Sequence, residues 1–222
     1  MGVLIASIII LVWLAHLFYS LVYLNVNLSD PLFYLNVFVQ AYLFTGLFIT
    51  AHDSMHGILS NNKKVNKLFG QICTALYACM SYKRLIKNHF MHHKNPGDEN
   101  DPDFNAKSQN FFLWWAAFLF RYTTVLQIIS MGIIYNVLKI WIPEIKLLMF
   151  WILPAFLSTF QLFFFGTYLP HRKPHLNEMK PHNARTQRKN HLLAMLSCYF
   201  FGYHYEHHEF PHIPWWQLYK VK

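Results

Sequence analysis

The sequence predicts an all-α integral membrane protein. Four transmembrane helices are expected in two hairpins, with interfacial helices and a cytosolic histidine-rich metal-binding cap. Three observations lead to this fold class. Of the 222 residues, 55% are hydrophobic and only 13% are charged. Apolar runs long enough to cross a bilayer recur along the chain. The cationic residues concentrate in two segments, which the positive-inside rule places in the cytosol.

The distribution of charge also limits the class of partner. Of the 19 Lys and Arg, eight lie between Asp53 and Asn110 and eight follow Pro170. The net charge of +9 could indicate nucleic acid binding. However, the chain has no polar module in which basic and aromatic side chains alternate, so no nucleic acid partner is expected. Residues 1–222 are expected to form a single domain, and the sequence leaves its oligomeric state open.

Four apolar segments are predicted to cross the membrane, at residues 3–24, 32–51, 123–142 and 145–169. The first has no basic residues before it and no small-residue cleavage site. It is therefore predicted to be a membrane helix and not a signal peptide. Polar or proline-containing turns at 25–31 and 143–146 would lie on the outer side and close the two hairpins.

Three further segments are too short to span a bilayer and are predicted to lie at its surface, at residues 68–82, 111–120 and 192–203. Pro154 lies within the last spanning segment. Because proline lacks an N–H and its ring crowds the preceding turn, a kink is expected there.

Histidines form three compact groups at the predicted cytosolic ends of these segments. Two groups share the pattern H-x-x-H-H and the third is an i, i+4 pair, so each group points its rings from one helical face. Their number exceeds the four ligands of one zinc ion. Imidazole suits several transition metals, but the count favours two ions with positions left for oxygen, which we interpret as a di-iron site. The eight residues are His52, His56, His89, His92, His93, His204, His207 and His208.

A ninth ligand is expected in the last cytosolic segment. His171 is favoured because it lies at the cytosolic end of a predicted helix, as His52 does. Three other histidines of this segment are alternatives: His175, His182 and His191.

Carboxylates near the histidines could fix the imidazole tautomers. Asp53 and Glu206 lie inside the boxes and could accept imidazole N–H bonds, although simple solvent exposure is the alternative. Asp53 is the candidate catalytic residue. The acidic run at 98–103 is expected to be a solvated loop. A role for Asp101 or Asp103 in orienting imidazoles is the competing interpretation.

The chain carries no redox cofactor motif of its own. It has no iron–sulfur ligand set, no glycine-rich nucleotide fingerprint and no C-x-x-C-H haem attachment site. Cys73, Cys79 and Cys198 stand singly and are expected to be free thiols. Electrons for any redox chemistry must therefore come from a partner.

Several longer runs carry a resemblance to a known family. They are HDSMHG at 52–57, DPDF at 101–104, FGTYLPHR at 165–172, HNAR at 182–185 and FGYHYEHHEFPHIPWW at 201–216. With the three histidine boxes, they resemble the membrane-bound di-iron desaturase and hydroxylase superfamily, and within it the bacterial β-carotene ketolases.

This resemblance implies an O2-dependent di-iron oxygenase with two iron ions held by the eight box histidines and His171. It would introduce a keto group at C4 of the β-ionone ring by two successive hydroxylations and loss of water. β-Carotene would give echinenone and then canthaxanthin, and zeaxanthin is a further candidate substrate that would give astaxanthin. The carotenoid would come from the bilayer, electrons from a ferredoxin-type donor, and the setting would be a bacterial inner membrane.

Four other functions remain open from the sequence. A carotenoid 3-hydroxylase or a fatty-acyl desaturase would use the same metal site. A membrane haem protein or a metal transporter belongs to another class. It is less favoured because the histidines lie at helix mouths and in loops and not at mid-membrane.

Overall fold

The computed structural model describes all 222 residues, and every regular element in it is a helix. Two long helices open the chain, α1 (Gly2–Tyr23) and α2 (Pro31–Met55). A third long helix runs from Glu144 to His171. Its successive parts are α7 (Glu144–Leu147), η1 (Leu148–Ile152), α8 (Leu153–Phe163), η2 (Phe164–Tyr168) and α9 (Leu169–His171).

Shorter helices fill the segments between and after these. They are α3 (Lys63–Ala78), α4 (Tyr82–Lys94), α5 (Phe111–Tyr122), α6 (Val125–Leu138), α10 (His191–Cys198) and α11 (His204–Glu209). Two 3₁₀ turns, η3 (Asn177–Met179) and η4 (Trp215–Val221), complete the chain.

Three helices are long and apolar enough to cross a membrane, namely α1, α2 and the helix from Glu144 to His171. They agree with three of the four predicted spans. The fourth prediction, at 123–142, corresponds to α6, which has 14 residues. At 1.5 Å per residue this helix is about 21 Å long, short of a hydrocarbon core of about 30 Å. Helices α5 and α6 meet at an angle of 87°. They make a fourth span only if this bent pair is taken as a single crossing.

Capping residues fix where the helices that lead to the site begin. The Asp30 carboxylate accepts the N–H of Leu32, and Pro31 occupies the first helical position of α2. The Ser81 hydroxyl accepts the N–H of Arg84 at the start of α4. Such side chains satisfy amide groups that the first turn of a helix leaves unpaired. The starting point in turn determines which residues of α2 and α4 share a face.

The core lies between α1, α2 and the long helix from Glu144 to His171. Phe44, Leu47 and Phe150 are fully buried there, and Trp13 meets Phe44 edge to face at 5.1 Å. By contrast, α6 has no buried residue. A helix that is apolar and exposed on all sides is typical of a lipid-facing segment.

The long helix from Glu144 to His171 contains two π turns, and each is followed two residues later by a proline. The turn Leu148–Ile152 precedes Pro154, and Phe164–Tyr168 precedes Pro170. A proline ring displaces the carbonyl four residues earlier, so the helix widens instead of breaking. The expected distortion at Pro154 therefore takes the form of a widened turn in a helix that continues to His171.

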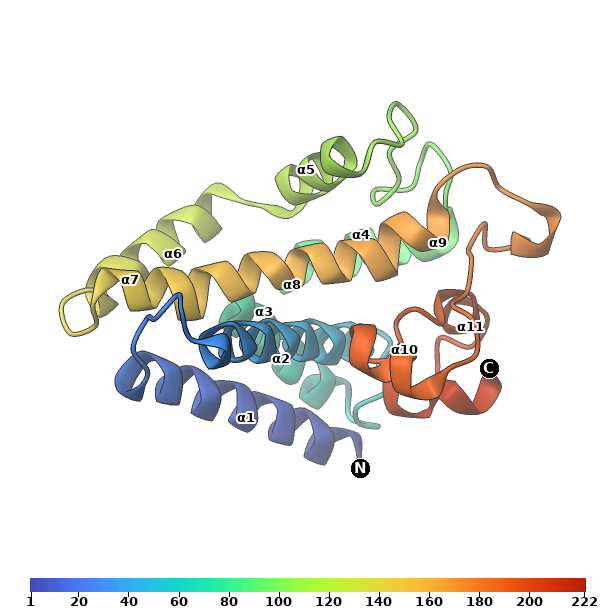
Figure 1. The fold of residues 1–222 in the computed structure, drawn as a ribbon. Coiled ribbons are helices and arrows are strands. Elements are labelled where there is room, and N and C mark those ends of the chain that lie inside the picture. The colour runs from blue at the N-terminus through green and yellow to red at the C-terminus, as the bar shows by residue number, and fades with distance from the viewer.

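Figure 1 shows how these elements bring distant segments together. Helices α1 and α2 lie side by side, and the long helix from Glu144 to His171 runs along α2, with α5 and α6 beyond it. The end of α2, α9 and the C-terminal helices α10 and α11 gather at one end of the molecule (Figure 1). All three histidine groups lie at this end.

The packing of α2 on α3 can be tested at Gly70. A β-carbon at Gly70 would collide with the ring of Tyr82 and the hydroxyl of Ser54. We expect Gly70→Ala to lower the free energy of unfolding by about 1–3 kcal/mol because of overpacking. Thermal unfolding in detergent would measure this.

Gly132→Ala is the matched control, since a β-carbon there meets nothing within 4 Å in the exposed helix α6. It should leave stability unchanged or slightly raised. Equal stability of both variants would contradict the close packing of α2 on α3.

Candidate metal centre

Nine histidines converge at the end of the molecule where α2, α4, α9 and α11 meet. Their ring nitrogens form two groups, and within each group all the nitrogens lie within 4.8 Å of one another. We call these cluster A, made of His52, His56, His89, His93 and His207, and cluster B, made of His92, His171, His204 and His208. Together they contain the eight box histidines and His171.

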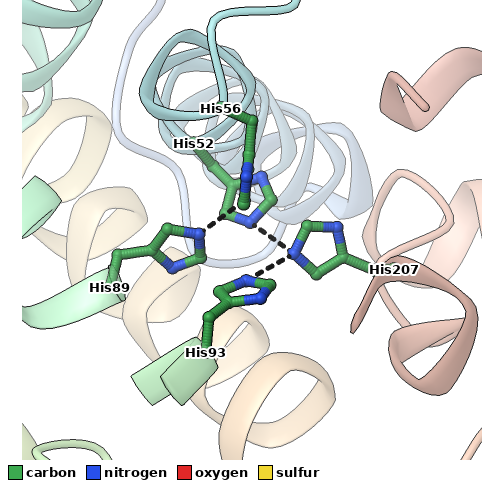
Figure 2. A group of neighbouring side chains, drawn as sticks. All are labelled: His52, His56, His89, His93 and His207. Carbon is green, nitrogen blue, oxygen red and sulfur yellow. Dashed lines mark hydrogen bonds between the residues drawn. The ribbon is translucent and has the colours of Figure 1, made fainter. Parts of the chain in front are cut away.

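Cluster A draws its rings from three helices. Figure 2 shows the side chains of His52 from α2, His56 from the C-cap of α2, His89 and His93 from α4 and His207 from α11, all pointing toward one another. The Nε2 atoms of His56 and His89 are 2.6 Å apart, and Nε2 of His207 lies 3.1 Å from His52 and 3.0 Å from His93.

Cluster B is fully buried. Nε2 of His208 lies 3.1 Å from Nε2 of His92 and 3.0 Å from Nε2 of His204. His171 completes the group from the end of the long helix, its ring centroid 4.7 Å from that of His92 and 4.9 Å from that of His204.

The two H-x-x-H-H boxes divide in the same way. In each box the first and fifth residues point to one cluster, and the fourth points to the other. His89 and His93 join cluster A and His92 joins cluster B, whereas His204 and His208 join cluster B and His207 joins cluster A. Residues i and i+4 lie directly above one another on a helix, and residue i+3 is offset to one side. Each box therefore serves both clusters and holds them next to each other.

The donor set fits two metal ions. Two nitrogens bound at about 2.1 Å and at right angles stand about 3.0 Å apart, and opposed ones about 4.2 Å apart. The separations of 3.0–3.1 Å in both clusters match the right-angle value, whereas His56 and His89 lie closer together, at 2.6 Å. A neutral imidazole has one N–H to donate, so five nitrogens that converge on one point cannot all be satisfied by hydrogen bonds among themselves. In cluster B, Nε2 of His171 is buried without any hydrogen-bond partner. A cation would satisfy these lone pairs.

Three of the outward-facing nitrogens are held by oxygen atoms. His92 donates from Nδ1 to Oδ2 of Asp101 at 2.9 Å, and His171 donates from Nδ1 to the carbonyl of Asn183 at 3.0 Å. His52 donates from Nδ1 to Oδ1 of Asp53 at 3.3 Å. These contacts fix the tautomer in which Nε2 carries the free lone pair, as metal-binding histidines require.

Burial keeps most of these rings uncharged. It lowers the pKa of His56 to about 4. Together with the neighbouring His56 and His92, it also lowers the pKa of His93 to about 2. Burial opposes protonation of His92 too, but the carboxylates of Asp101 and Asp103 outweigh it and raise the pKa of that ring. Neutral imidazoles are the form that binds metals.

An apolar cavity of about 200 Å³ opens onto both clusters. His52 and His89 of cluster A and His92 and His204 of cluster B contribute to its lining. Along the long helix the lining residues run from Ala155 to Thr167. At 1.5 Å per residue this corresponds to about 18 Å, so the cavity is elongated. An elongated apolar cavity that leads to a metal site suits a long hydrophobic molecule.

The alternatives to His171 lie outside both clusters. Nε2 of His175 bonds to the carbonyl of His171 at 2.9 Å. His182 pairs with Glu209 at 2.8 Å, and His191 bonds to the Tyr203 hydroxyl at 3.1 Å.

The carboxylates differ from one another in their surroundings. Asp53 is buried and also accepts the N–H of Trp215 at 3.0 Å. Glu206 instead accepts from Thr186 and Lys222 and holds none of the imidazoles. The interpretation of the acidic run as a solvated loop is wrong for Asp101, which is 2% exposed and bonded to His92. Sequence reasoning missed Asn183, because a backbone carbonyl leaves no signature in residue type.

An all-helical, strongly apolar chain with two adjoining clusters of buried imidazoles defines the class of helical histidine-box metal enzymes. Comparison with known proteins agrees. The fatty acid desaturase family model matches residues 29–146 and 125–222. The chain belongs to the fatty acid desaturase family.

Among curated relatives, the chain is similar to β-carotene ketolases of bacteria and algae. It is 36% identical to the β-carotene ketolase of Paracoccus sp. (strain PC1), over 95% of this chain and 87% of the relative. It is 38% identical to the zeaxanthin 4-ketolase of Chlamydomonas reinhardtii over 83% of this chain, and 38% identical to β-carotene 4-ketolase 3 of Haematococcus lacustris over 81%. The chain spans 43% and 59% of the length of these two algal proteins. No solved structure matches it.

The two clusters predict separate losses of metal. We expect His56→Ala, in cluster A, and His171→Ala, in cluster B, each to lose about one of two bound metal ions, because each removes a ligand from one set only. Elemental analysis of the purified variants would measure this. His212→Ala, at an exposed position outside both clusters, should keep both ions. A full metal complement in His171→Ala would contradict the assignment of the ninth ligand.

The hydrogen bond from His92 to Asp101 can be tested by substitution. Asp101→Asn should weaken metal binding about 10- to 100-fold, because an amide accepts the His92 N–H less strongly than a carboxylate. Competition with a chelator would measure the affinity. Asp98→Asn is the control, since Asp98 is exposed and bonds only to backbone amides nearby. Unchanged metal affinity in Asp101→Asn would show that the contact with His92 does not support the site.

Proposed function

We propose that the chain is an O2-dependent di-iron oxygenase that introduces a keto group at C4 of the β-ionone ring of β-carotene. Echinenone would form first and canthaxanthin second. The main support is one combination of observations. Two imidazole clusters open onto an elongated apolar cavity. The chain is also similar, over 95% of its length, to a β-carotene ketolase.

Iron bound in the clusters would supply the activation of O2 needed to oxidise an unactivated C–H bond. The nine histidines fit two such ions, and their neutral rings leave the charge of the centre high. His92 and His171 would keep their Nε2 lone pairs directed inward through Asp101 and the Asn183 carbonyl. Asp53 would act in catalysis through His52, which it holds from the side opposite the cluster.

The reaction would proceed in two rounds at the same carbon. Each round consumes one O2, two electrons and two protons, converts one C4–H bond to C4–OH and releases one water. After the second round C4 carries two hydroxyl groups. Loss of one further water then leaves the ketone.

The size of the cavity indicates how the carotenoid would lie. A volume of about 200 Å³ is below the range of about 300–1,000 Å³ typical for whole drug-sized ligands. We infer that it takes one β-ionone ring and the adjoining part of the polyene. Apolar side chains such as Leu85, Phe118 and Phe201 would exclude water and hold the ring against the histidines. The remaining polyene would extend out between the helices into lipid.

The proposed setting is a bacterial inner membrane crossed four times, with α5 and α6 together forming the bent third crossing. The exposed apolar surface of α1 and α6 supports burial in lipid. The histidines would face the cytosol, because most Lys and Arg lie in the same two segments as the boxes.

A ferredoxin-type protein is proposed as the electron donor. Helix α4 presents His89, His92 and His93 to the clusters. It exposes four cationic side chains, Lys83, Arg84, Lys87 and Lys94, and contains no acidic residue. A basic surface close to the metal site would attract an acidic carrier and speed its association at low salt.

The reaction can be tested in bacterial cells that accumulate β-carotene. Expression of the chain should yield echinenone and canthaxanthin, identified by chromatography and mass spectrometry. His92→Ala should reduce ketone formation about 100-fold or more, because it removes a ligand from cluster B. Cells supplied with zeaxanthin would show whether hydroxylated rings are also accepted.

The alternatives give different products. Zeaxanthin formed from β-carotene without any ketone would indicate a 3-hydroxylase. A changed pattern of lipid double bonds without any ketone would indicate a fatty-acyl desaturase. Either result would contradict the proposed reaction.

A further inference from the structure

Thr167 occupies a distinctive position beside the metal clusters. It lies in the π turn Phe164–Tyr168, four residues before His171, and its side chain lines the apolar cavity together with His204 and Phe201. Thr167 is only 5% exposed. It therefore places a hydroxyl group at the metal end of a cavity whose walls are mostly apolar.

The hydroxyl of Thr167 has no partner within the protein. The chain has eight threonines, and the side chains of the other seven are hydrogen-bonded. Those within or at the ends of helices mostly donate to a carbonyl three or four residues earlier, as Thr50 does to Gly46 and Thr123 to Leu119. The remaining bonded threonines are Thr45, Thr74, Thr124, Thr159 and Thr186.

The π turn explains this exception. Threonine hydroxyls in helices usually bond back to the preceding turn. Pro170 widens the helix at residues 164–168 and displaces the backbone carbonyls of this turn, and the Thr167 hydroxyl makes no bond to them. Thr167 lines the apolar cavity, and a hydroxyl that is left without a hydrogen bond in apolar surroundings costs free energy. A ligand that supplies the missing hydrogen bond would recover that cost.

β-Carotene is a hydrocarbon and cannot supply this bond. The product of the first oxidation can, because it carries a hydroxyl at C4. We propose that Thr167 binds the C4 hydroxyl of this half-oxidised ring and directs the second oxidation to the same carbon. This inference rests on the proposed function and deepens it, since it names the residue that makes the product a ketone and not an alcohol.

The surroundings of Thr167 support this role. A β-carbon at the adjacent Gly166 would collide with the ring of Phe201. The Phe201 ring in turn lies 5.0 Å from that of His52 and 5.1 Å from that of His204. Phe201 thus forms a wall that bridges both clusters, and Thr167 lies beside it. With the C4 hydroxyl turned to Thr167, the remaining C4–H bond would face the clusters.

The second round then follows the balance already given. The bound alcohol loses its remaining C4–H bond, with consumption of one O2, two electrons from the external carrier and two protons, and release of one water. The resulting diol loses a second water to form the ketone. Thr167 takes no proton or electron in either step, and its contribution is to retain and orient the alcohol.

Product partition tests this proposal. In cells that accumulate β-carotene, Thr167→Val should raise the ratio of 4-hydroxylated to 4-keto products about tenfold, which is the effect of one ordinary hydrogen bond. Thr167→Ser keeps the hydroxyl and should restore the ratio to within about twofold of the wild type. Thr167→Ala also removes the hydroxyl but leaves a smaller side chain, and its ratio of products should resemble that of Thr167→Val.

Thr123→Val is the matched control. Thr123 also lines the cavity, but its hydroxyl already donates to Leu119. This variant should leave the ratio of alcohol to ketone unchanged, even where the loss of a cavity-lining hydroxyl lowers the total yield of product. An unchanged ratio in both Thr167→Val and Thr167→Ala would overturn the proposal, as would an equal rise in Thr123→Val.

Binding to the metal-loaded protein in the absence of any reductant provides a second readout that does not depend on turnover. The wild type should bind 4-hydroxy-β-carotene more tightly than β-carotene, as measured by quenching of tryptophan fluorescence. Thr167→Val should reduce this preference about tenfold. Equal preference in the wild type and in Thr167→Val would overturn the role of Thr167. Failure of the wild type to form any ketone would instead overturn the proposed function.

Discussion

The architecture depends on the convergence of imidazole lone pairs in a largely buried space. Nine rings from four helical segments point their nitrogens into two adjoining clusters. Burial lowers the pKa of His56 to about 4 and of His93 to about 2, so these two rings stay uncharged near neutral pH. Unpaired polar atoms are costly in such a setting. Cations at the two points of convergence would pair with these nitrogen lone pairs. The rest of the fold holds the rings in place around them.

Helical geometry explains how so few segments can build two sites. A single box on α4 sends His89 and His93 to one cluster and His92 to the other, and α11 mirrors this arrangement. The two clusters thereby come close, with the rings of His93 and His208 centred 4.3 Å apart across the boundary. If α4 began one residue earlier or later, its imidazoles would point away from the two clusters. The cap at Ser81 and the contact between His92 and Asp101 therefore bear on the site as directly as the ligands do.

Much of this arrangement could be predicted from the sequence, because apolar length and ligand spacing are local properties. The helices at α1, α2 and the long C-terminal segment follow from runs of apolar residues, and the eight box histidines follow from their i, i+3, i+4 spacing. What could not be predicted depends on tertiary contacts. The sequence leaves the role of Asp101 open between two alternatives, because the bond from His92 to Asp101 depends on how the loop at 98–103 folds back on α4. The Asn183 carbonyl that holds His171 carries no sequence signal. The 87° bend after Tyr122 and the π turn at Thr167 are likewise products of packing and of nearby prolines.

The claim that two irons occupy separate histidine sets can be tested by anomalous scattering at the iron absorption edge, measured on crystals of active protein. The account predicts two peaks, one within about 2.2 Å of the Nε2 atoms of cluster A and one equally close to those of cluster B. A single peak shared between the clusters, or active protein with no peak at either cluster, would contradict it.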